Sequence, residues 1–148
     1  MTSKFKWSAV LLSVAILAGA ADSPRQVARA ADPNDLEIAH IAYTAGAIDI
    51  RYAHLALALS EDPGVREFAT LMVRDHGAVN DKALALVEEL KITPQDNATS
   101  QQLSQQAAQI RDELRQLTGA AFDKRYAANE LAYHQAVNGA VEGTLVPA

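Results

Sequence analysis

The chain has 148 residues, no cysteine and a formal charge of −5, which limits both its size and its chemistry. The length corresponds to about one domain, and the lack of cysteine excludes thiol catalysis, disulfide bonds and zinc–cysteine sites. After residue 30 the chain keeps 9 of its 13 basic and 17 of its 18 acidic residues, a formal charge of −8. An acidic domain of this kind argues against nucleic acid as a partner.

The first 30 residues have the pattern of a secretory signal peptide. Lys4 and Lys6 precede an apolar run over residues 7–18, and small residues follow it. Cleavage after residue 20 or after residue 30 fits the small residues at 18–20 and at 28–30. The apolar run is shorter than the about 20 residues of a transmembrane helix. We therefore expect an exported protein of the periplasm or outer envelope, without a transmembrane helix after cleavage; an uncleaved signal anchor is the alternative.

Residues 31–148 show helical spacing throughout and no strand pattern, so the sequence predicts a single all-α domain. A first helix is expected to begin at Asp32, as its N-cap, and to end near Ser60. Asp62 and Pro63 then cap and open a second helix, which ends near Leu90 before a stretch of breaking residues. The short turn makes these two helices an antiparallel hairpin.

Two further helices are expected, over residues 99–117 and 120–141. The third is rich in glutamine and carries only a thin apolar stripe, as in a mostly solvated connector. The fourth carries larger apolar residues, among them Phe122 and Tyr126. The predicted architecture is an antiparallel bundle of three long helices and a shorter connector helix.

Titratable residues lie on the faces of these helices that point into the bundle: Asp49, His76 and His134, with Asp123 and Glu130 on the face of His134. At 1.5 Å per residue, Asp49 lies about 19 Å and His76 about 22 Å from the turn between the first two helices. The two side chains are therefore expected at the same depth. Such a pair is either a buried hydrogen-bonded pair or part of a metal site.

Two segments carry a family resemblance. "MVRDHGAVN" supplies Met72, Val73, Asp75, His76 and Asn80, and "FDKRYAANELAYH" supplies Phe122, Asp123, Tyr126 and His134. Together they resemble the signature of an exported bacterial family catalogued as domain of unknown function 4142, over roughly residues 33–146. The resemblance implies a ferritin-like helical bundle in the cell envelope, and it implies no known activity.

The chain departs from the family pattern in two places. Asp49 stands where the family has glutamate, one methylene longer. The last helix of the family pattern is absent, so we expect a bundle that is incomplete at its C-terminus. Apolar stripes left exposed in this way are typical of association surfaces, which predicts a homo-oligomer or a partner helix that covers them.

Three functions stay open at this point. The first is a non-catalytic, stress-related envelope protein that keeps His76 and His134 as buried histidines paired across the bundle. The second is a metal-binding or redox protein that holds a single divalent metal ion with His76, His134, Asp49, Asp123 and Glu130 as its candidate ligands. It lacks the Glu-x-x-His spacing of di-iron bundles, because Val73 and Leu131 occupy those positions. The third is a module that captures a partner helix.

Overall fold

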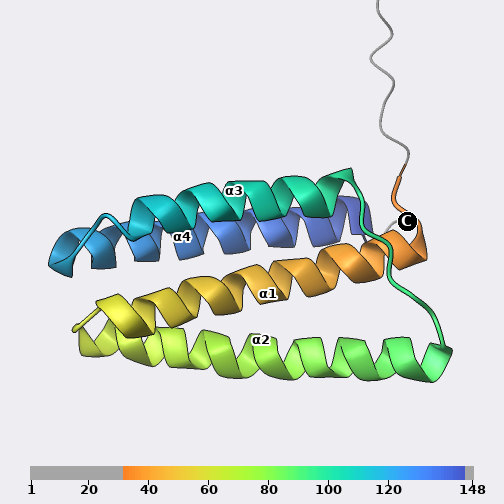
Figure 1. Cartoon of the computed structure of the whole chain (residues 1–148), viewed down its shortest axis with the longest axis horizontal. Coiled ribbons are helices and arrows are strands. Elements are labelled where there is room, and N and C mark those ends of the chain that lie inside the picture. The colour runs from red at the N-terminus through yellow and green to blue at the C-terminus, as the bar shows by residue number, and fades with distance from the viewer. Residues whose placement is uncertain (1–31, 146–148) are drawn as a thin grey trace, which may run out of the picture. The chain divides into compact units, whose positions relative to one another are not determined.

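The computed structural model describes residues 32–145, which form four α-helices and a terminal π-helical turn (Figure 1). The helices are α1 (Asp35–Leu59), α2 (Pro63–Leu90), α3 (Ala98–Leu114) and α4 (Gly119–Ala140), followed by η1 (Val141–Leu145). No strand occurs among the described residues. The all-α prediction is therefore confirmed. The predicted signal peptide and its cleavage sites lie outside the described residues.

Local sequence signals explain most of the helix ends. Asp62 accepts a hydrogen bond from Val65 N at 2.9 Å, and Pro63 occupies the first turn of α2, as expected. The start of α1 was expected at Asp32, and this is wrong. Asn34 is the N-cap: its side chain accepts from the backbone of Leu36 and Glu37, and Glu37 accepts from Asn34 N in return. This reciprocal capping box satisfies more free N–H groups than a cap two residues earlier could.

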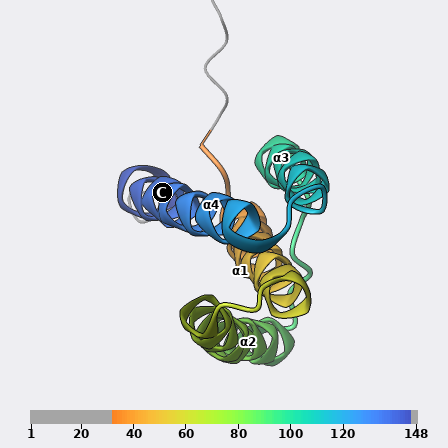
Figure 2. The same cartoon turned by 90° about the vertical axis from the view of Figure 1, so that its left-hand side faces the viewer.

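Helix α1 lies between α2 on one side and α3 and α4 on the other, as the end-on view in Figure 2 shows. A helix in this position is buried on several faces, which requires apolar or small residues around much of its circumference. The sequence of α1 meets this demand with alanine, glycine and isoleucine, and its buried residues are Ile41, Gly46, Ile48, Asp49, Tyr52, Ala53 and Ala56.

The hydrophobic core is built around the second half of α1. Tyr52, Phe122 and Tyr126 are its largest fully buried side chains. Helix α3 joins the core through Ala107 and Leu114, while most of its other residues are exposed or half-buried, in keeping with the thin apolar stripe of its sequence. The core therefore fixes α4 against α1 at the end near the α1–α2 turn.

Large apolar side chains remain exposed on the outer surfaces of α2 and α4. Val79, Leu86, Leu90 and Leu131 are all more than half exposed, at 61%, 53%, 56% and 63%. No helix within residues 32–145 is long and apolar enough to cross a membrane. The expected exposed apolar surface is therefore present.

Candidate metal centre

Asp49, His76 and His134 come together from three helices at mid-height of the bundle. One potential ligand atom of each lies within 4.8 Å of those of the other two. The Nε2 atom of His76 lies 2.6 Å from Asp49 Oδ2, and the Nε2 atom of His134 lies 3.5 Å from the same oxygen. The pairing of Asp49 with His76 confirms the expectation that the two residues lie at the same depth in the hairpin.

The carboxylate of Asp49 is fully buried. Its side chain has 0% exposure, against 29% for His76 and 36% for His134. Its Oδ2 atom forms an ion pair with His76 Nε2 at 2.6 Å, and a contact with Glu130 also favours its charged form. Buried carboxylates are normally paired or bound to metal, because an isolated charge in the interior is costly.

The electrostatics of the pair nevertheless keep both groups charged over part of the pH range. Burial tends to raise the pKa of Asp49, but contacts with His76 and Glu130 and the charges of the two histidines together hold it below its usual 3.8. Contact with Asp49 raises the pKa of His76 above 6.5, although burial acts against this. The pair thus favours an ionised carboxylate.

The orientation of His134 is fixed by its own helix. Its Nδ1 atom lies 2.9 Å from the backbone carbonyl oxygen of Glu130. A carbonyl oxygen can only accept, so Nδ1 carries the proton in this contact and Nε2 of the neutral ring keeps its lone pair. That lone pair lies on the side of Asp49. A histidine whose second nitrogen binds a carbonyl is the usual arrangement of a metal ligand.

Glu130 lies beside this group but does not belong to the three-residue set. It is 3% exposed, and its carboxyl group contacts Asp49 and Asn129. Its Oε2 atom is 4.0 Å from His134 Nδ1. Burial, followed by the neighbouring Asp49, raises the pKa of Glu130 to about 9. Glu130 is therefore a protonated neighbour of the site at neutral pH.

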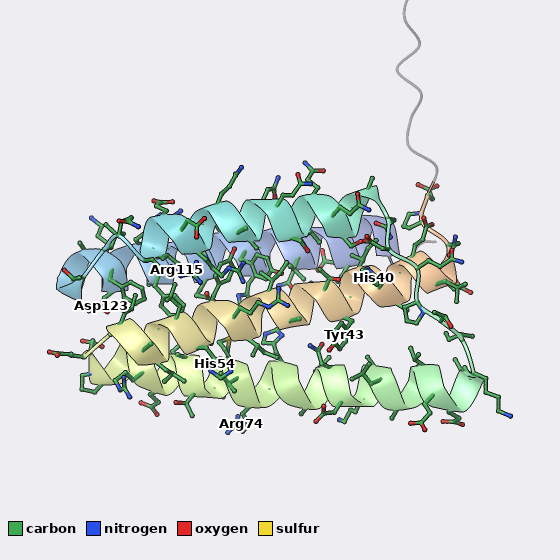
Figure 3. The ribbon with its side chains drawn as sticks, in the orientation of Figure 1. His40, Tyr43, His54, Arg74, Arg115 and Asp123 are labelled. Atoms are coloured by element: carbon green, nitrogen blue, oxygen red, sulfur yellow. The ribbon has the colours of Figure 1, made fainter. Side chains whose placement is uncertain are left out.

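Asp123 lies away from the group, although the sequence places it on the same face of α4. Its Oδ1 atom accepts a hydrogen bond from the Ser60 hydroxyl group at 2.5 Å. Figure 3 shows Asp123 at the end of the bundle where α4 begins. This bond joins the start of α4 to the end of α1. Asp123 is therefore too far from His134 for the two residues to bind the same metal ion.

Two contacts that shape the site were not expected from the sequence. The hydroxyl group of Tyr133 donates to Ala45 O at 2.8 Å and ties α4 to α1 one turn from Asp49. Gly46 faces the buried Asn80, and a Cβ atom at Gly46 would lie only 2.5 Å from Asn80 Oδ1. A glycine within a helix often marks such a close approach, so Gly46 was the available signal.

The chemistry of this donor set is specific. Two imidazole nitrogens and one carboxylate oxygen suit zinc, copper, iron or nickel, whereas calcium and magnesium favour sites built from oxygen alone. Three protein ligands also leave a coordination position free, as in catalytic zinc sites.

Comparison with known proteins assigns the chain to a family. A family model described as "Domain of unknown function (DUF4142)" matches residues 20–148. No curated protein and no solved structure matches the chain. The resemblance seen in the two sequence motifs is thus confirmed, whereas the ferritin-like relationship stays a prediction.

Proposed function

This chain belongs to the DUF4142 family, and we propose that it is a metal-binding helical protein that holds one divalent transition-metal ion between Asp49, His76 and His134. The observation that carries the proposal is the state of Asp49. Its carboxylate is fully buried, and imidazole nitrogens from two other helices lie 2.6 and 3.5 Å from its Oδ2 atom. An ion between the three side chains would satisfy the carboxylate and both nitrogens together.

Zinc is the simplest ion for a test, because it has no redox chemistry and binds imidazole and carboxylate in tetrahedral sites. We expect the full chain, without an affinity tag, to bind about one Zn²⁺ in a calorimetric titration. We also expect bound Zn²⁺ to raise the melting temperature, because the ion binds the folded state.

The variants His76→Ala, His134→Ala and Asp49→Asn each remove one ligand and should weaken zinc binding by at least about tenfold. His54→Ala is the matched control. His54 is an exposed histidine of α1 (labelled in Figure 3), and its loss should leave the affinity unchanged. A wild-type chain that binds no stoichiometric zinc, copper, nickel or iron would refute the proposal. So would a loss of affinity in His54→Ala equal to that in His76→Ala.

We also propose that the protein resides in the cell envelope. Support for this location comes from the signal-like residues 1–30, with Lys4 and Lys6 ahead of an apolar run. Fractionation of cells that express the full chain tests it: the mature protein should appear in the periplasmic or outer-envelope fraction, shortened by 20 or 30 residues. A full-length product in the cytosol would contradict this part of the proposal.

Association through α2 is a second candidate function, and the exposed apolar residues favour it. Helix α2 packs chiefly on α1, and Leu86 and Leu90 lie more than half exposed on its outer surface. Sedimentation should then show a concentration-dependent oligomer that the double variant Leu86→Lys/Leu90→Lys dissociates. A monomer at all concentrations, without binding of an apolar dye, would rule out self-association by this surface.

A further inference from the structure

A cavity of about 510 Å³ extends from the candidate metal centre along the gap between α1 and α4. Small apolar residues line most of it, including Ala42 and Ala45 on α1 and Ala136, Val137 and Ala140 on α4. Helix α3 closes one side with Leu103 and Ile110. The volume falls in the range of small-molecule sites, which are mostly apolar with a few convergent polar groups.

The two imidazoles of the metal centre lie at one end of the cavity, and Asn80, Thr99 and Gln106 add polar groups to its wall. The rings of His76 and His134 both belong to its wall, and their centroids lie 5.7 Å apart. The nearby hydroxyl group of Tyr133 is already bonded to Ala45 O. The lining of α4 continues from Tyr133 to Val141, about 12 Å at the rise of an α-helix. The cavity is therefore elongated, with two imidazoles at one end and mostly apolar residues along its length.

The charge of the metal-loaded centre decides which kind of head group can bind at that end of the cavity. The three residues of the metal centre provide one carboxylate and two imidazoles, so a divalent ion held there keeps one uncompensated positive charge. Both histidine ligands line the cavity, so a coordination position left free by the three protein ligands would be accessible to a molecule bound there. A cationic head group would be repelled by this charge, whereas an anionic head group would be attracted to it.

We propose that the chain binds a medium-chain fatty acid or a similar monocarboxylate with an unbranched tail, its carboxylate on the free position of the bound metal ion and its tail between α1 and α4. This inference rests on the proposed metal-binding function. The anionic head matches the residual positive charge, and the tail replaces water along an apolar wall.

Decanoate is the probe, used below its micellar concentration with the full chain. Calorimetry should show that zinc-loaded protein binds decanoate at least about tenfold more tightly than chelator-treated protein. Methyl decanoate, which keeps the tail and lacks the anionic head, should show no dependence on zinc. With Co²⁺ in place of Zn²⁺, decanoate should alter the visible absorption of the metal, because its carboxylate enters the coordination shell.

A matched pair of variants on α4 tests the position of the tail. Ala132 and Ala136 are both exposed and lie one turn apart, but only Ala136 lines the cavity. Ala136→Trp should weaken decanoate binding by at least about tenfold while zinc stoichiometry stays at one. Ala132→Trp should change neither. If Ala136→Trp fails to fold, Ala140→Trp places the same obstruction near the outer end of the cavity.

The two proposals fail in different ways. Zinc is titrated before any fatty acid is added, so a chain that binds no metal ion refutes the proposed function and, with it, the metal-bound carboxylate. A chain that binds one Zn²⁺, yet binds decanoate no better with zinc than without, overturns the present inference alone. Equal losses in Ala136→Trp and Ala132→Trp would also overturn it, because the tail would then lie elsewhere.

Discussion

Replacement of Glu130 by glutamine should change how the stability of the metal-free protein depends on pH. Glu130 is 3% exposed and its pKa is raised to about 9 from its usual 4.5. A group with a raised folded-state pKa binds its proton more tightly in the folded protein than in the unfolded chain. Its stabilising contribution is therefore complete below pH 4.5 and is lost progressively as the pH rises towards 9.

The size of the effect follows from proton linkage. Between these two pKa values the folded state holds about one proton more than the unfolded state, so the free energy of unfolding falls by about 1.4 kcal/mol per pH unit. From pH 5.5 to 7.5 this amounts to about 2.7 kcal/mol. Glutamine has a similar shape and no titrating proton, so Glu130→Gln should remove this part of the slope.

The assay is urea denaturation in the presence of a chelator, at several pH values between 5.5 and 7.5. His76 also loses stabilising protonation as the pH rises above 6.5, because its folded-state pKa is raised, so the wild-type slope contains both groups and the difference from Glu130→Gln isolates Glu130. Glu89→Gln, at an exposed position of α2, is the control and should keep the wild-type slope. Equal slopes in wild type and Glu130→Gln would refute the reasoning, because Glu130 would then be ionised in the folded protein.

Three further outcomes are expected. Gly46→Ala gains about 1 kcal/mol of helix propensity, but its Cβ atom would overlap the buried Asn80, so we expect a net destabilisation of up to about 2 kcal/mol in chemical denaturation. The double variant Gly46→Ala/Asn80→Ala should recover part of that loss, and additive losses would contradict the reasoning. Tyr133→Phe removes the hydrogen bond to Ala45 O and should lower the free energy of unfolding by about 1 kcal/mol, whereas an unchanged value would show that the bond contributes nothing. Zinc affinity should fall as the pH drops through the raised pKa of His76, because the imidazole must be neutral to bind metal. A pH-independent affinity in calorimetry would exclude His76 as a ligand.

Helix ends and the depth of Asp49 against His76 could be predicted from the sequence, because both depend on local signals. The Asp62–Pro63 start of α2 is a capping pattern, and equal depth follows from a short turn and a constant rise per residue. The start of α1 was misplaced because several polar residues precede the first apolar position, and only the reciprocal bonds of Asn34 and Glu37 decide among them.

Which carboxyl groups join the two histidines in the site could not be predicted in the same way. Glu130 and Asp123 lie on one face of α4 with His134, yet Asp123 bonds to Ser60 and Glu130 remains beside the group. The position of α4 along α1 decides which of these carboxyl groups lies close to the histidines. That placement is set by long-range packing of Phe122 and Tyr126 against α1, and it leaves no periodic pattern in the sequence.

The position of Asp49 in the centre of the bundle is itself an argument for a bound metal ion. Helix α1 is surrounded by three other helices, and most of its buried positions hold apolar or small residues, which stabilise such a location without desolvating a charge. Taking the charged Asp49 out of water is costly, and its ion pair with His76 offsets that cost only in part. Asp49→Leu should therefore raise the melting temperature of the metal-free protein and abolish zinc binding. A variant that melts lower than the wild type in the presence of chelator would instead show that the contact of Asp49 with His76 stabilises the fold by itself, without need of an ion.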